Sequence, residues 1–137
     1  MKEKWSIWTP IHIHKSQYEL ISLQQDWKGV KIIFDDEKIQ VEITYGEELL
    51  AFRSCDEGDR WKTIDNVLYE NGKNFFRGQL FFKVENSEFK NWYMQENFDI
   101  IKEMEFEHHV FVTANDIIDV LSLKEPKIKV LNIDNHK

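Results

Sequence analysis

The chain has 137 residues, of which 42% are hydrophobic, and a formal net charge of −7. This length fits one domain over residues 1–137, and its hydrophobic content is enough for a core that needs no structural metal or disulfide. The acidic charge disfavours nucleic-acid binding, and no apolar run approaches the ~20 residues of a membrane span. The one cysteine, Cys55, fits a reducing compartment, so we expect a cytoplasmic protein.

The N-terminal third begins irregularly and then settles into a strand pattern. Pro10 interrupts the first apolar stretch, so residues 5–14 are expected to hold one or two short extended pieces. Residues 18–23 either continue as a strand or form a helical turn. Farther along, hydrophobic and polar residues alternate, which is typical of strands with one face in water. These predicted strands, at residues 29–34, 39–45 and 49–55, are joined by short turns and form an antiparallel meander.

The middle of the chain predicts two helices separated by a strand. In residues 56–72 the apolar residues recur at helical spacing, and Gly72 lies where that helix would end. Residues 78–86 return to strand alternation. Ser87 precedes a second run at helical spacing, and its side chain is a favoured N-cap for a helix over residues 87–97.

The C-terminal third predicts a strand, a helix and a last strand. Residues 105–113 alternate as a strand. Thr113 is placed to cap a helix over residues 114–123, and Asp116 would lie in its first turn, where the helix dipole favours a negative charge. Residues 127–133 form the last strand. We therefore expect an α+β fold, a mainly antiparallel sheet with two or three helices packed on one face.

The sequence gives only weak signs of a metal site or of a reactive cysteine. His12 and His14 lie two apart and would share one side of a strand, as two metal ligands do. No zinc-binding motif completes the set, so surface histidines are the favoured interpretation, and we expect no metal and no cofactor. Cys55 stands beside Asp56 and Glu57, whose charges disfavour a reactive thiolate.

Six residues are the candidates for a binding site. Arg53, Glu57 and Arg60 surround a predicted strand-to-helix junction, where they would form either a binding constellation or a local ion-pair network. Tryptophan is favoured at interfaces and is also an ordinary core residue, so its role stays open. The complete candidate set is Arg53, Glu57, Arg60, Trp92, Glu96 and His109.

The adjacent residues His108 and His109 must point to opposite sides of the strand over residues 105–113. His108 shares its side with Val110 and Val112, the side that helices would cover. We expect it to lie at the margin of that side with one ring nitrogen hydrogen-bonded, in a structural role. His109 is expected to look toward the other, open face, and is therefore the functional candidate of the pair.

Several motifs occur in an order known from other proteins. They are Val-Glu-Asn-Ser at residues 84–87, Trp92 on the next helix, His108 near the start of the following strand, and Thr-Ala-Asn-Asp at residues 113–116. With these motifs, residues 29–128 resemble small uncharacterised cytoplasmic proteins of low-GC Gram-positive bacteria, some of which look like immunity proteins of polymorphic toxin systems. The resemblance implies a toxin-masking role and implies no catalytic residue.

Two kinds of function remain open from the sequence. The first is a non-enzymatic, immunity-like module whose acidic, aromatic-rich surface binds a protein partner such as a basic toxin domain. The second is a small-ligand-binding protein or hydrolytic enzyme that uses His109, Arg53, Glu57 and Glu96. A deep pocket holding these groups would favour the second function, and a flat acidic face with exposed aromatic side chains would favour the first.

Overall fold

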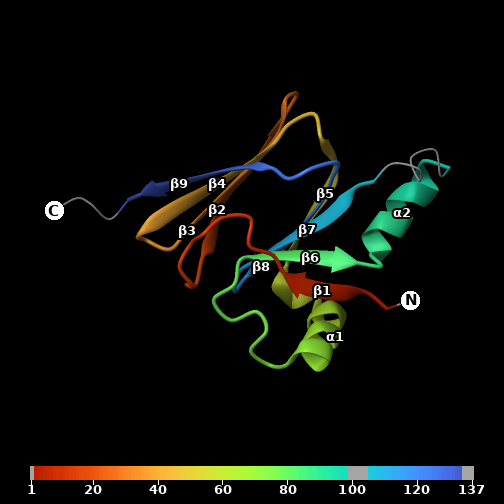
Figure 1. Ribbon diagram of the computed structural model, residues 1–137, viewed down its shortest axis with the longest axis horizontal. Helices are drawn as coiled ribbons and strands as arrows, with labels where there is room; N and C mark the ends of the chain where they lie inside the picture. Colours follow the sequence, from red (N-terminus) through yellow and green to blue (C-terminus); the bar gives the residue numbers. More distant parts are fainter. Residues whose placement is uncertain (1, 99–104, 134–137) are drawn as a thin grey trace.

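The computed structural model describes residues 2–98 and 105–133, which form an α+β fold of two antiparallel sheets and two α-helices (Figure 1). The five-stranded sheet has the order β1 (Lys4–Ile7), β6 (Phe81–Glu85), β7 (Glu107–Val112), β8 (Asp116–Ser122) and β5 (Leu49–Asp56). The four-stranded sheet has the order β2 (Glu19–Asp26), β3 (Gly29–Asp35), β4 (Ile39–Tyr45) and β9 (Lys127–Asn132). The predicted fold class is confirmed, and so are the three strands predicted over residues 29–55. The predicted meander of these three strands is wrong beyond β4, because β4 pairs with β3 and β9, whereas β5 pairs with β8 in the other sheet.

The main hydrophobic core lies between the two sheets. In β4 the buried and half-buried residues alternate strictly, as the sequence pattern predicts for a strand with one wet face. Phe34 and Ile43 from the four-stranded sheet are fully buried, and so are Phe111 and Ile118 from the five-stranded sheet. Because the two inner faces bury each other, the five-stranded sheet keeps only its outer face for the helices.

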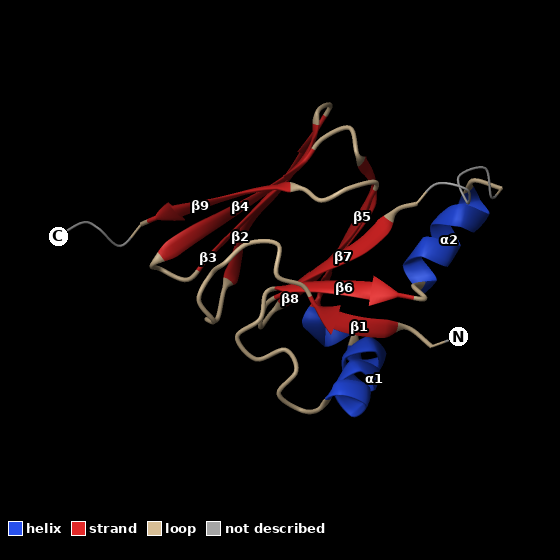
Figure 2. Cartoon of the chain, viewed as in Figure 1, coloured by secondary structure: helices blue, strands red, loops and turns tan. Residues whose placement is uncertain are grey.

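Both helices cover that outer face. α1 (Trp61–Asn71) buries Val67 against β6, β7 and β8, and α2 (Glu88–Glu96) buries Phe89 at the other end of the same face. Figure 2 shows the two helices together on the side of the molecule away from the four-stranded sheet. The helices predicted over residues 56–72 and 87–97 are confirmed, as is their packing on one face. A short 3-10 helix, Glu57–Asp59, precedes α1.

The helix predicted over residues 114–123 is wrong, because this segment is strand β8. The Thr113 hydroxyl accepts hydrogen bonds from the N–H groups of Asn115 and Asp116, but these bonds close a turn between β7 and β8 instead of capping a helix. β8 is buried on both faces, so its apolar residues form a continuous run without alternation. Such a run is ambiguous between a buried strand and a helix.

Within the described ranges, no helix is long and apolar enough to cross a membrane.

Candidate functional site

Both helices begin at residues that reach back to the sheet. α2 begins after Ser87, whose hydroxyl accepts a hydrogen bond from the Lys90 N–H at 3.0 Å, which confirms the predicted N-cap. α1 begins after Arg60, whose side chain makes no capping hydrogen bond. That side chain turns to the sheet instead, where its Nη1 donates to Asp119 at 2.7 Å. The starts of both helices are thereby tied to the outer face.

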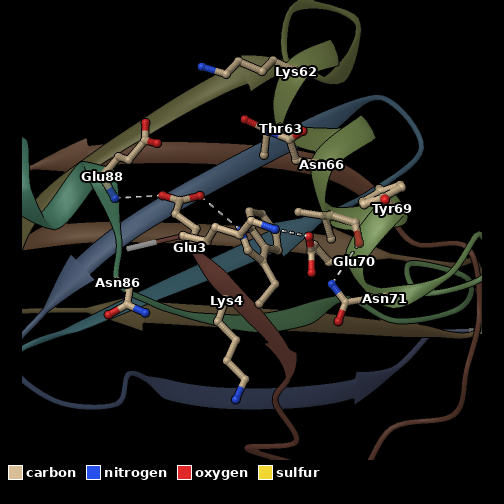
Figure 3. Close-up of a pocket in the computed structure, with 13 residues that line it drawn as sticks. Glu3, Lys4, Lys62, Thr63, Asn66, Tyr69, Glu70, Asn71, Asn86 and Glu88 are labelled. Atoms are coloured by element: carbon tan, nitrogen blue, oxygen red, sulfur yellow. Dashed lines mark hydrogen bonds and ion pairs between the residues drawn. The ribbon is translucent and has the colours of Figure 1, made fainter.

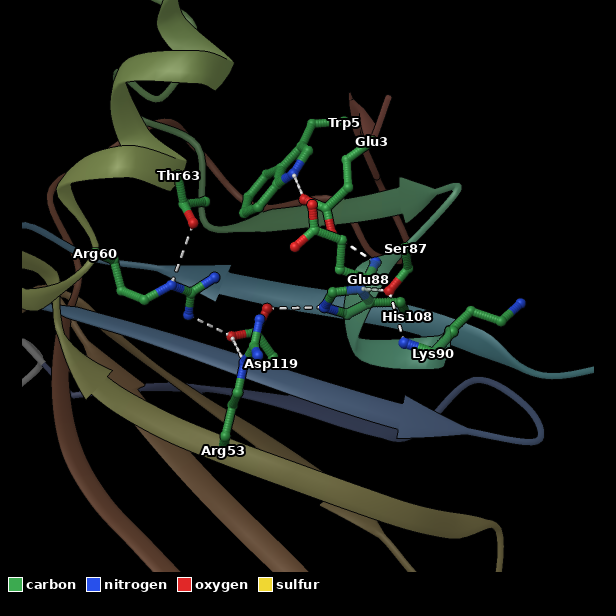
Figure 4. Close-up of polar contacts among 10 residues, drawn as sticks. All are labelled: Glu3, Trp5, Arg53, Arg60, Thr63, Ser87, Glu88, Lys90, His108 and Asp119. Atoms are coloured by element: carbon green, nitrogen blue, oxygen red, sulfur yellow. Dashed lines mark hydrogen bonds and ion pairs between the residues drawn. The ribbon is translucent and has the colours of Figure 1, made fainter. Parts of the chain in front are cut away.

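Asp119 on β8 is the centre of a buried hydrogen-bond network on this face (Figure 4). Its Oδ2 accepts from Arg60 Nη1 at 2.7 Å and from Arg53 Nε at 3.0 Å. Its Oδ1 lies 2.7 Å from His108 Nε2, and His108 Nδ1 lies 2.7 Å from the Ser87 hydroxyl. The network therefore runs from the N-cap of α1 through Asp119 and His108 to the N-cap of α2.

One arrangement of protons satisfies every group in this network. Ser87 Oγ accepts from the Lys90 N–H, which leaves its own O–H to donate to His108 Nδ1. The proton on His108 Nε2 then points to Asp119. Among the described residues, no buried side-chain nitrogen or oxygen lacks a hydrogen-bond partner. A buried network satisfied in this way holds its members in one arrangement.

The carboxylate of Asp119 stays ionised although it is fully buried. Burial by itself would raise the pKa of the Asp119 carboxyl, because it penalises the charged form. The hydrogen bond from His108 and the two guanidinium charges outweigh burial and hold the pKa far below its ordinary value. Asp119 is therefore a fixed negative charge that aligns Arg53 and Arg60.

Stacked side chains connect this network to the surface of α2. The Arg53 guanidinium carbon lies 4.3 Å from the centre of the Phe89 ring. The Phe89 ring in turn stacks on Trp92, with ring centres 5.7 Å apart and planes 20° apart. Trp92 is half exposed. Three of the six candidates, Arg53, Arg60 and Trp92, are thus brought together through Asp119 and Phe89.

Two other candidates lie near this face without joining the network. Glu57 lies in the 3-10 helix before α1, and its N–H donates to the Asn115 carbonyl. Glu96 is exposed in the last turn of α2. Both residues therefore lie beside the helices and outside the Asp119 network.

The sixth candidate, His109, lies in the interior between the two sheets. His108 and His109 point to opposite sides of β7, as predicted, but both are buried. The expectation that His109 looks onto an open face is wrong, because the four-stranded sheet covers that face. The expectation that His108 lies at a margin with one bonded nitrogen is also wrong, because both of its nitrogens are hydrogen-bonded.

The surroundings of His109 mirror those of His108. His109 Nδ1 lies 2.7 Å from the Tyr45 hydroxyl, and Nε2 lies 2.7 Å from Glu107. Trp8 stacks on the ring, with centres 4.3 Å apart. Burial lowers the pKa of His109, against the opposing effect of Glu107, and so favours the neutral ring. Each histidine thus has a hydroxyl on Nδ1 and a carboxylate on Nε2, which makes both of them structural links.

Two of the metal and thiol candidates, His14 and Cys55, each have a defined polar neighbour. His14 Nε2 lies 2.6 Å from Asp36 on the loop after β3. No group of three or more potential ligands that could hold a metal ion is found in residues 2–98 and 105–133. Cys55 is a free thiol on β5 beside Arg60, so its spatial neighbour is a cation and not only the carboxylates next to it in sequence.

Asp119 is the residue that the sequence interpretation missed. It lies in the apolar run at residues 117–121, and burying a lone aspartate is costly unless its charge is paired. An aspartate inside an apolar run therefore indicates a buried, paired carboxylate. Because this segment was predicted to be a helix, Asp119 was not assigned to either face of a strand. Its partners are distant in sequence, since Arg60 lies 59 residues away and Arg53 lies 66 residues away.

The network contains a serine, a histidine and an aspartate in hydrogen-bond contact, the groups of a hydrolase triad. A nucleophilic serine needs an accessible oxygen, but Ser87 is only 2% exposed and its Oγ already accepts from the Lys90 N–H. The arrangement therefore orients two helices, and it offers no open nucleophile in this conformation.

Several aromatic side chains on the two helices are exposed to solvent. The exposed aromatic side chains on or directly after the two helices, called the helix-face aromatics below, are Trp61, Tyr69, Trp92 and Phe98. Exposed aromatic side chains of this size are candidates for contact with a partner. Comparison of the chain with protein-family models, with curated proteins and with solved structures gives no match.

Proposed function

We propose that this protein is a non-enzymatic, immunity-like module that binds another protein through the helix-covered face of its five-stranded sheet. The observation that carries the proposal is the exposure of the helix-face aromatics, from 50% for Trp92 to 88% for Phe98. Tryptophan and tyrosine at such positions are the residues that most often dominate the binding energy of interfaces.

The partner is proposed to have a basic surface, such as that of a toxin domain. The net charge of −7 favours association with a cation-rich surface and speeds the encounter. Glu57 and Glu96 stand beside the helices, where carboxylates would steer a basic partner without being buried. The mechanism is occlusion, with aromatic anchors at the centre of the contact and carboxylates at its rim.

The Asp119 network supports this mechanism by fixing the surface before the partner arrives. Because it connects the N-caps of α1 and α2, it sets the spacing of Trp61 on one helix and Trp92 on the other. A surface that is already ordered loses less conformational entropy on binding.

The alternative function, an enzyme or ligand-binding protein that uses His109, Arg53 and Glu57, has less support. Arg53 binds Asp119 on the outer face of the five-stranded sheet, whereas His109 is enclosed between the sheets. A reaction or a small ligand would need both groups in one cavity.

The test begins with the tagged protein expressed in the cells from which it comes. A protein that co-purifies in stoichiometric amount is identified, purified separately and titrated by calorimetry against the wild type and three variants. We expect Trp61→Ala and Trp92→Ala each to weaken binding by about tenfold or more, as hot-spot residues do.

The matched control is Trp27→Ala. Trp27 is 89% exposed, but it lies in the turn between β2 and β3 of the other sheet. Its removal should leave the affinity unchanged within about twofold, a difference too small for a lost anchor. The proposal is overturned if no protein co-purifies, or if Trp27→Ala weakens binding as much as Trp92→Ala does.

A further inference from the structure

A cavity of about 700 Å³ opens between β1, α1 and the turn that joins β6 to α2 (Figure 3). Its size is typical of sites that hold small ligands or single segments of a partner. Trp5 and Val67, both buried, form its apolar part. None of the six candidate residues from the sequence lines it. It borders the proposed binding surface, because Tyr69 is one of its lining residues.

Two of the charged groups that line the cavity, Lys2 and Glu70, form an ion pair, and a third, the Glu3 carboxylate, is hydrogen-bonded within the protein. Lys2 Nζ donates to Glu70 at 2.6 Å. The Glu3 carboxylate accepts from the Glu88 N–H at 2.8 Å and from Trp5 Nε1 at 3.4 Å. Figure 3 shows the ammonium groups of Lys4 and Lys62 pointing away from the middle of the group. With three lysines and three glutamates in its lining, the cavity has no formal charge excess and favours an uncharged occupant.

The remaining polar groups are suited to an uncharged hydrogen-bonding chain. Asn66 and Asn86 line the cavity at exposed positions, and neither side-chain amide is hydrogen-bonded to another residue within the described part of the protein. Each amide offers both donors and an acceptor, the same pair of functions that a peptide group carries. Asn86 has a φ of 56°, a left-handed conformation that asparagine adopts more easily than most residues, so its place at the turn has a backbone reason as well.

The strand beside the cavity has a free edge. Among the described residues, β1 is the outer strand of its sheet and pairs only with β6, so the main-chain groups on its other side have no strand partner there. Such an edge accepts an extended segment of another chain as an additional strand. β5, the outer strand on the opposite side, is interrupted by a register shift between Leu49 and Ala51, whereas the β1 pairing is regular.

We infer that this cavity receives an extended peptide segment of the protein partner, with its main chain beside β1 and its peptide groups bound by Asn66 and Asn86. The inference rests on the proposed protein-binding function and specifies where one segment of the partner lies. Tyr69, which is 87% exposed at the cavity, would close over that segment. An uncharged saccharide would use the same amides but gains nothing from the free edge of β1, so the peptide is the better fit.

The probe is a phage-displayed library of random linear peptides, selected on the immobilised wild-type protein. Enriched peptides are synthesised, and their affinity is measured by fluorescence polarisation. Asn66→Leu removes one amide from an exposed helix position. Asn86→Gly removes the other and keeps the left-handed backbone available. We expect each variant to weaken peptide binding by about fivefold to tenfold, as the loss of one or two hydrogen bonds does.

Trp92→Ala is the control, because Trp92 belongs to the proposed surface but not to the cavity. It should change peptide affinity by no more than about twofold. If the peptides are sensitive to Trp92→Ala and insensitive to both asparagine variants, the cavity inference fails while the protein-binding function stands. If no peptide is enriched, or if a neutral oligosaccharide panel binds in an Asn66-dependent manner and peptides do not, the inference is also overturned. Failure of the co-purification experiment refutes the proposed function independently of the peptide result.

Discussion

Replacing Asp119 with asparagine keeps the shape of the side chain and removes its charge. In the wild type, one carboxylate oxygen accepts from Arg53 and Arg60 while the other is bonded to His108. The amide of Asp119→Asn has only one acceptor oxygen, so a donor must face either the guanidinium groups or the imidazole N–H. At least one charge-assisted hydrogen bond is lost, and a buried cation loses its counter-charge.

The expected loss of stability is about 3 kcal/mol at neutral pH. Removing one partner of a buried ion pair costs about 3–5 kcal/mol, and the asparagine retains part of the bonding, which favours the lower end. Most of this loss comes from Arg60 and His108, whose side chains are 13% and 1% exposed. Arg53 is 40% exposed, so solvent screens its contribution. Domains of this size commonly have about 5–15 kcal/mol of stability, so the variant should still fold.

The pH dependence supplies an independent check. The pKa of Asp119 is lowered in the folded protein, so its contribution to stability is present above the pKa of an unfolded aspartate, about 4, and is lost as the pH falls below it. Urea unfolding measured from neutral pH down to about pH 3 should therefore show the wild type and Asp119→Asn converging at acid pH. The control is Asp65→Asn, which removes the same charge from an exposed position of α1. The reasoning is refuted if the free energy of unfolding of Asp119→Asn at pH 7 lies within about 0.5 kcal/mol of the wild-type value. It is also refuted if the difference between the two proteins stays constant across this pH range.

Three other measurements test the remaining structural assignments. Ser87→Ala should lose about 2 kcal/mol in urea unfolding, because α2 loses its cap and His108 loses a partner; a loss equal to that of an exposed serine such as Ser6→Ala would contradict the assignment. His109→Ala should lose about 2–4 kcal/mol and leave partner affinity unchanged, the reverse of the sequence expectation. Because burial lowers the pKa of His109, wild-type stability should also fall as the pH drops below about 6.5, and His109→Ala should show less of this fall. Chelator treatment should leave the melting temperature unchanged; stoichiometric zinc whose removal lowers it would show the opposite.

Local sequence patterns were sufficient to predict the helices and strands that have one face exposed to water. The alternation in β3 and β4 gave the correct strands and buried faces, because a period of two is a property of the strand itself. Ser87 marked the start of α2 because an N-cap acts on N–H groups only three residues away. The opposite orientation of His108 and His109 followed from the same strand geometry.

Only the tertiary structure determined what β8 and His109 pack against. β8 is buried on both faces, so its sequence carries no alternation and reads equally well as a helix until β5 and β7 are placed beside it. His109 is enclosed because a second sheet covers its side of β7, a fact that no pattern within β7 contains.

For the candidate site too, the sequence predicted one part and the tertiary structure determined the other. The sequence did show its residue types, which are an arginine in β5, a second arginine before α1 and an aromatic residue on α2. Their assembly was not, since Arg53, Arg60, Ser87 and His108 meet only where β8 places Asp119 among them. These hydrogen bonds join residues that are close in space but far apart in sequence. A local sequence pattern therefore identifies the possible donors and acceptors but not which of them pair. The pairing is set by strand register, which the whole fold determines.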